Sequence, residues 1–176
     1  AHAISLSNGG TFALAAADLR TGILRTEAIT RTTASPVDGV SVAAASAEIR
    51  DVLTFAAGSA GTAYFDWGFD GSIYVDPGHP YNPNSPATAA LSVTITSLLN
   101  NTQVYSARLA TATSGGDCGG APVANCLTGS FAQAAVAFRG TVPFAITPGA
   151  FSFRFSLGSS AQAGDDLLFG NTSYLY

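Results

Sequence analysis

The chain has 176 residues, of which 47% are hydrophobic and only 10% are charged, with a formal net charge of −4. This length and composition are enough for one domain with a continuous core, so we expect residues 1-176 to form a single domain. All seven cations are arginines and they form no basic stripe, which disfavours binding to nucleic acid or to an anionic membrane surface. No apolar run approaches the roughly 20 residues that a membrane-spanning helix needs.

The pattern along the chain is that of short strands separated by turns. Thr, Ser, Gly and β-branched residues dominate, and no long stretch repeats apolar residues at helical spacing. In chain order, the candidate strands are 3-7, 11-16, 22-33, 40-57, 62-76, 88-98, 102-112, 130-139, 141-147 and 150-157. About ten strands with such short connections predict an all-β protein, an antiparallel β-sandwich of jelly-roll-like topology, with a closed barrel as the alternative. The Ala-rich pieces 13-20 and 43-50 are interpreted as strand or loop, with a helical turn in each as the alternative.

Two segments alternate with period two and therefore predict which side chains face the core. In 62-76, one parity carries Phe65, Trp67, Phe69, Ile73 and Val75, whereas the other carries Asp66, Asp70, Ser72 and Asp76, with a possible turn at Asp70-Gly71. The stretch 150-157 alternates phenylalanine with serine and arginine. The residues predicted to be buried are Trp67, Phe69, Phe151, Phe153 and Phe155.

The two cysteines, Cys118 and Cys126, lie in a glycine-rich stretch. Two cysteines without adjacent histidines are too few for a metal site, and their spacing is too wide for a thioredoxin-type pair. A local disulfide is therefore expected, which is typical of an exported chain. The opening Ala1-His2-Ala3-Ile4 fits the residues that follow a signal-peptidase site, although a cloning remnant would look the same. We expect a secreted or cell-surface protein.

The proline-rich loop 76-87 is the first candidate for ligand binding. Aromatic rings and amide groups gather around it, as they do on sugar-binding platforms, and the alternative is that the rings pack the loop onto the sandwich. The candidate ligand-binding residues are Tyr74, Asp76, His79, Tyr81, Asn82 and Asn84.

Aspartates at turns are candidates for structural calcium, because carboxylate and carbonyl oxygens are the ligands that Ca²⁺ prefers. These are Asp70, Asp165 and Asp166, although turn-forming aspartates without a metal are the common alternative. No other cofactor is indicated. The only histidines, His2 and His79, lie in no nucleophile motif, so we expect no enzyme activity.

The last third of the chain contains Gly140-Thr141-Val142-Pro143-Phe144 and Phe169-Gly170-Asn171-Thr172-Ser173, with Asp165-Asp166 just before the second motif. The middle contains the segment AEIRDVLTFAAGSAGTAYFDWGFDGSIYV. Together these pieces resemble the exported domain of bacterial PEP-CTERM surface proteins, although Ser173 replaces the usual Ala. The resemblance implies export to the cell surface or extracellular matrix and transfers no catalytic residues. Proteins of that family end in a Pro-Glu-Pro motif, one transmembrane helix and basic residues. We expect that this segment was either removed by exosortase-type processing or left out of this sequence.

The first strand, 3-7, is followed by the turn residues Asn8-Gly9-Gly10 and contains Ile4 and Leu6. It has no charge and no proline, so it has none of the usual protection against pairing with another chain. Two hypotheses about partners follow. The first is a structural or adhesive protein that associates with other copies of itself through strand edges, and the second is a module that binds extracellular polysaccharide through the 74-84 region.

Overall fold

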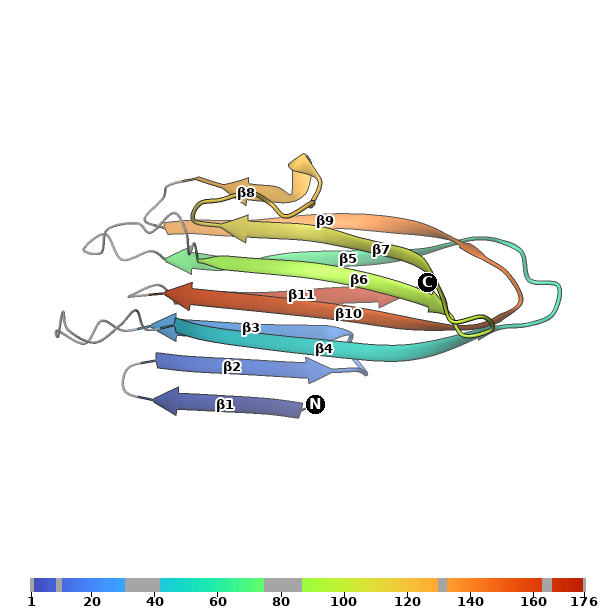
Figure 1. Cartoon of the computed structure of the whole chain (residues 1–176), viewed down its shortest axis with the longest axis horizontal. Coiled ribbons are helices and arrows are strands. Elements are labelled where there is room, and N and C mark those ends of the chain that lie inside the picture. Colours follow the sequence, from blue (N-terminus) through green and yellow to red (C-terminus); the bar gives the residue numbers. More distant parts are fainter. Residues whose placement is uncertain are drawn as a thin grey trace.

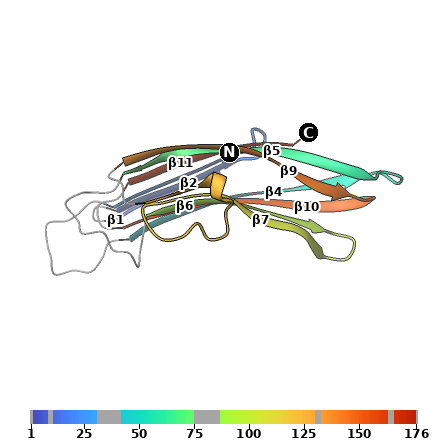
Figure 2. The ribbon, with the colours of Figure 1, turned by 90° about the horizontal axis from the view of Figure 1, so that it is seen from above.

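The computed structural model describes residues 2–8, 11–30, 42–74, 87–129, 133–162 and 166–175. These residues form two β-sheets stacked as layers, as Figure 2 shows, and contain eleven strands and one 3₁₀ turn. Sheet A has the order β1 (His2–Asn8), β2 (Thr11–Asp18), β3 (Ile23–Thr30), β11 (Asp166–Leu175), β5 (Gly61–Tyr74) and β9 (Gln133–Ile146). Sheet B has the order β4 (Val42–Phe55), β10 (Gly149–Gln162), β6 (Thr88–Ser97), β7 (Thr102–Thr113) and β8 (Cys126–Thr128). The 3₁₀ turn η1 (Val123–Asn125) immediately precedes β8.

The strand order confirms the predicted jelly-roll-like sandwich. The strands β3-β11-β5-β9 of sheet A face β4-β10-β6-β7 of sheet B (Figure 1). Within this unit each strand crosses to the other layer from the one before it, except β7, which pairs with β6, and this is the arrangement of two Greek keys. The β1–β2 hairpin extends sheet A beyond this eight-stranded unit, and β8 extends sheet B. All strand pairs are antiparallel except β7–β8, which is parallel.

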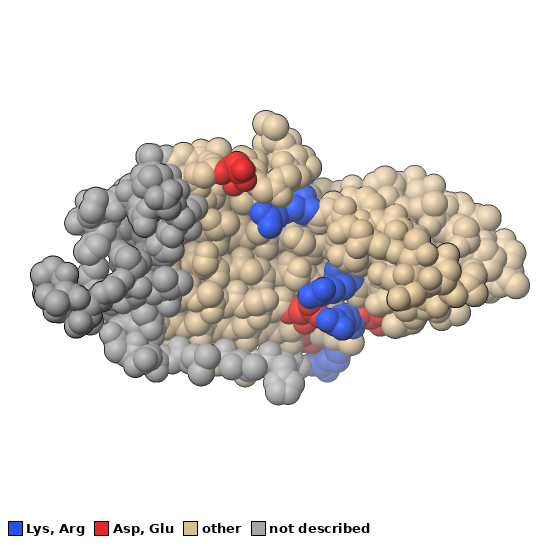
Figure 3. All heavy atoms as spheres, viewed as in Figure 1, with Lys and Arg blue, Asp and Glu red and all other residues tan. Residues whose placement is uncertain are grey.

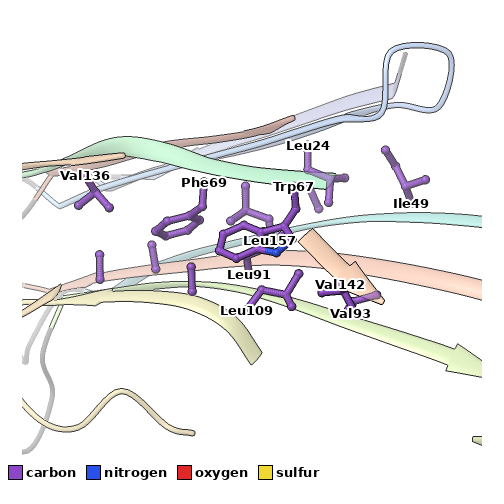
Figure 4. Close-up of a cluster of buried hydrophobic side chains, with 14 of the residues drawn as sticks. Leu24, Ile49, Trp67, Phe69, Leu91, Val93, Leu109, Val136, Val142 and Leu157 are labelled. Carbon is purple, nitrogen blue, oxygen red and sulfur yellow. The ribbon is translucent and has the colours of Figure 1, made fainter. Parts of the chain in front are cut away.

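The core lies between the two layers, and period two decides which side chains enter it. Trp67 and Phe69 of β5 are buried and point into the space that Leu91 and Leu157 occupy (Figure 4). Phe153 of β10 is buried as predicted and packs edge-on against Phe144, with ring centroids 5.3 Å apart. Phe151 is also buried, whereas Phe155 is only partly buried and lies edge-on against Phe65. The predicted parity is therefore correct on both strands.

Some predicted strand boundaries are wrong. The segments 130-139 and 141-147 are not two strands, because Gln133–Ile146 forms the single strand β9, which continues through Gly140; residues 130-132 lie outside the described residues. β5 likewise continues through Asp70-Gly71 without a turn. Both Ala-rich pieces contribute to strands, β2 and β4. The strands β8 and β11 were not among the strands predicted from alternation. β11 nevertheless lies inside sheet A, because β3 and β5 pair with it on either side.

Candidate functional site

β1 forms one edge of sheet A. It pairs with β2 along its whole length, from His2 opposite Ala17 to Asn8 opposite Thr11. No strand among the described residues pairs with its other side. Its outer backbone N–H and C=O groups are therefore available for a further strand.

The four edges of the two sheets differ in how they are protected. In the part of the chain that the structure describes, sheet A ends in β1 and β9, and sheet B ends in β4 and β8. Charged residues, proline and very short strands all hinder pairing at an edge. β9 carries Arg139 and Pro143, β4 carries the charged residues of 48–51, and β8 has only three residues. β1 has seven residues with no carboxylate, arginine or proline, so it is the least protected of these edges.

β1 also lies beyond the region where the two sheets face each other. β2 packs against β4 of sheet B, whereas β1 mainly contacts β2, its neighbour in sheet A (Figure 1). The side chains of Ala3 and Ser5 are exposed. The register places Ile4 opposite Ala15 and Leu6 opposite Ala13. The structure thus places both predicted assembly residues on an edge strand.

The β4 edge of sheet B carries a small ionic cluster. Arg50 of β4 lies directly opposite Arg154 of β10, and both guanidinium groups donate a hydrogen bond to the carboxylate of Glu48. Partial burial acts to raise the pKa of Glu48, but the hydrogen bonds and charges of the two arginines outweigh it and hold that pKa below 4.5. The carboxylate thereby offsets the repulsion between two facing cations.

The predicted disulfide between Cys118 and Cys126 is confirmed. Side-chain hydrogen bonds fix its loop to the edge of sheet B: Thr111 donates to the carbonyl of Cys118 at 3.0 Å, and Thr128 donates to that of Gly116 at 2.8 Å. The loop returns as β8, which pairs with Thr111–Thr113 of β7. The disulfide loop therefore covers the last three residues of the β7 edge, whereas no described strand pairs with the rest of that edge, which carries Arg108.

The candidate ligand-binding residues fall mostly outside the described residues. This applies to Asp76, His79, Tyr81, Asn82 and Asn84. Tyr74 ends β5, where its side chain is 44% exposed on the outer face of sheet A. It lies opposite Asp166 of β11 and Gln133 of β9.

The candidate calcium ligands are spread along sheet A. Asp165 lies outside the described residues, whereas Asp70 lies opposite Gly170 and Asp166 lies opposite Tyr74. Four positions along a strand separate these two aspartates by about 13 Å. Asp70 instead forms an ion pair with Arg139, with 3.6 Å between the guanidinium nitrogen and the carboxylate. Within the described ranges, no three His, Cys, Asp or Glu side chains are grouped so that they could hold a metal ion.

The end of the sandwich formed by 52-65, 93-107 and 140-153 contains no charged residue, and we call it the uncharged end. It includes the connections β4–β5, β6–β7 and β9–β10. Figure 3 shows the charged side chains of one face gathered near the middle of the molecule, whereas this end is free of them. Leu99, at 83%, is among its exposed apolar side chains. This uneven distribution of charge is not among the predictions made above from the sequence, although the three long intervals without a charged residue are visible in the sequence.

No family model matches the chain, and neither does any curated protein. Among solved structures, it is weakly similar to the enzymatically active domain of tailspike protein 4 of bacteriophage CBA120, at 11% identity and a TM-score of 0.29. That similarity covers 99% of this chain and 18% of the tailspike chain. A structure of infectious bursal disease virus, Gx strain, gives 10% identity and a TM-score of 0.19, over 94% of this chain and 51% of that one. The chain therefore spans less than two thirds of either structure, and similarities this weak assign neither family nor activity.

No helix among the residues that the structure describes is long and apolar enough to span a membrane.

Proposed function

We propose that this chain is a non-enzymatic structural or adhesive protein of the cell surface or extracellular matrix, and that it associates with itself through the free edge of β1. The observation that carries the proposal is the contrast between the edges. Charge, proline or brevity protects β4, β9 and β8, whereas β1 lacks all three. An added strand without proline gains main-chain hydrogen bonds at such an edge.

Two observations support an extracellular location. The Cys118–Cys126 disulfide is of the kind that forms and persists in oxidising compartments. The motifs of β9 and β11, beginning at Gly140 and Phe169, resemble those of exported PEP-CTERM surface proteins.

A lysine on β1 tests the proposal. Ser5→Lys places a charge on the free edge, where Ser5 is exposed, and Ala137→Lys places the same charge on the exposed face of β9, at the opposite edge of sheet A. In sedimentation velocity, the unmodified protein should show a weight-average coefficient that rises with concentration. The Ser5→Lys variant should stay monomeric, and the Ala137→Lys variant should behave like the unmodified protein.

The unfolding midpoint of Ser5→Lys should stay unchanged, which shows that the lysine blocks association and not folding. The proposal is wrong if the unmodified protein is monomeric at every concentration, or if Ser5→Lys associates as the unmodified protein does.

Polysaccharide binding is a second candidate, because Tyr74 exposes an aromatic ring on the outer face of sheet A, where β5 leads into 75-86. Affinity electrophoresis in gels containing dextran or alginate tests it. Tyr74→Ala should weaken retardation by about 5- to 10-fold, since one ring contact is worth about 1 kcal/mol. Tyr64→Ala is the matched control, because Tyr64 is 52% exposed on the same face at the other end of β5. Equal retardation of both variants and the unmodified protein would exclude a role for Tyr74.

A further inference from the structure

The sequence of β1 is close to a palindrome. The strand reads His-Ala-Ile-Ser-Leu-Ser-Asn, with Ser5 at its centre. On either side of this centre, Ile4 matches Leu6, Ala3 matches Ser7, and His2 matches Asn8. Ile4 and Leu6 are apolar residues of the same size, Ala3 and Ser7 are both small, and His2 and Asn8 are both polar.

We propose that β1 pairs antiparallel with β1 of a second copy, about a two-fold axis that passes beside Ser5. This inference rests on the proposed self-association through β1 and adds the partner strand, the symmetry and the register. In such a pair, residues whose numbers sum to 10 lie opposite each other. Ser5 then faces Ser5 of the other copy, and each Ile4 faces the other copy's Leu6.

The register follows from the strand itself. Directly opposed residues of an antiparallel pair share a face, so a two-fold axis must pair odd positions with odd ones and even positions with even ones. An axis at Ile4 or at Leu6 also satisfies this condition, but it pairs only five residues of each strand and sets His2 against Leu6, or Ile4 against Asn8. An axis at Ser5 pairs all seven residues and sets Ile4 against Leu6, the two large apolar residues of the strand.

A head-to-tail arrangement, in which β1 pairs with β9 of the next copy, is the main alternative. Sheet A has six strands that alternate in direction, so β1 and β9 run in opposite directions and copies could continue an antiparallel sheet without end. β9 opposes this arrangement, because Pro143 has no N–H to donate and Arg139 places a charge along that edge. In the two-fold pair, by contrast, β1 lies beside β1 of the second copy, and neither strand has a carboxylate, arginine or proline.

The symmetric pair closes on itself. Each copy uses the least protected edge among its described strands, so the two six-stranded sheets become one continuous antiparallel sheet and growth stops at two copies. A two-fold axis perpendicular to the sheet keeps the outer faces of both copies on the same side. The assembly is thus a dimer with one extended common face, and not an open fibre.

Single cysteines test both symmetry and register. Opposed Cα atoms in an antiparallel pair are about 4.5 or 5.5 Å apart, which lies within the range a disulfide spans. Ser5→Cys should therefore form a covalent dimer under copper-phenanthroline oxidation, detected on non-reducing gels. Ala3→Cys and Ser7→Cys should each remain monomeric, because the two equivalent positions would lie about 13 Å apart. A mixture of Ala3→Cys and Ser7→Cys should cross-link, since these positions face each other.

Ser46→Cys, at an exposed position on the β4 edge, controls for random collision and should not cross-link. Cross-linking of all three single β1 variants would indicate parallel pairing and overturn the inference. If the unmodified protein associates in sedimentation but no β1 cysteine cross-links, the two-fold pair is wrong while self-association stands. A protein that sediments as a monomer at every concentration would overturn both proposals.

Discussion

Gly140 and Trp67 show how one residue without a side chain serves the core. They lie directly opposite each other on β9 and β5, and the indole of Trp67 is 4% exposed. A Cβ atom at position 140 would lie 2.6 Å from the nearest atom of the indole ring, closer than real Cβ contacts come. Packing against the indole therefore requires glycine at position 140. This glycine makes room for a ring within a continuous strand and does not mark a turn.

Gly140→Ala should lower the free energy of unfolding by about 1–3 kcal/mol, because a buried ring cannot move aside without displacing its neighbours. Trp67 is the only tryptophan, so its fluorescence reports both the unfolding transition and any change in the native surroundings of the ring. The matched control is Gly158→Ala on β10, where an added Cβ would meet nothing within 4 Å. That variant should stay within about 0.5 kcal/mol of the unmodified protein. Equal stabilities of the two variants would contradict the packing explanation.

At the scale of the element, Glu48 links β4 to β10 at the edge of sheet B. Its carboxylate lies between Arg50 and Arg154, which face each other across the two strands. Because the pKa of Glu48 is lower in the folded protein, its contribution to stability is complete above its ordinary value of 4.5. The contribution is lost as the pH falls through the lower, folded-state pKa.

Glu48→Gln should therefore cost up to about 1 kcal/mol at pH 7, which is the upper range for partly exposed ion pairs. The difference from the unmodified protein should be smaller at pH 3 than at pH 7, because protonation of Glu48 at low pH removes the charge that the glutamine lacks. Urea unfolding at the two pH values measures it. The chain has one other glutamate, Glu27 on β3, and Glu27→Gln controls for the loss of one negative charge elsewhere. A cost that is the same at both pH values would show that the ionic cluster is not its cause.

At the scale of the whole molecule, the sequence predicts which side chains face the core better than it predicts which strands lie next to each other. Alternation in β5 and β10 identifies the buried faces, because burial on one side of a strand is a local property of period two. Sheet order is not local. β11 has no clear alternation between Leu167 and Asn171, and it is a strand because β3 and β5 pair with it from both sides.

The same distinction applies to the candidate site. The lack of charge and proline in 3-7 is visible in the sequence, but its meaning depends on β1 being the last strand of sheet A. Asp70 illustrates the opposite case. An Asp-Gly pair favours a turn locally, yet β11 and β9 pair with β5 on both sides and keep Asp70 within a continuous strand.

The uncharged end has a consequence for resistance to proteolysis. Exposed loop tips are where proteases usually make their first cut, and many digestive and secreted proteases cut only after lysine or arginine. The chain has no lysine, and no arginine occurs between Arg50 and Arg108, or between Arg139 and Arg154. All three connections at this end fall within those intervals. A trypsin-like protease that meets the exposed Leu98-Leu99 tip therefore finds no bond there that it can cleave.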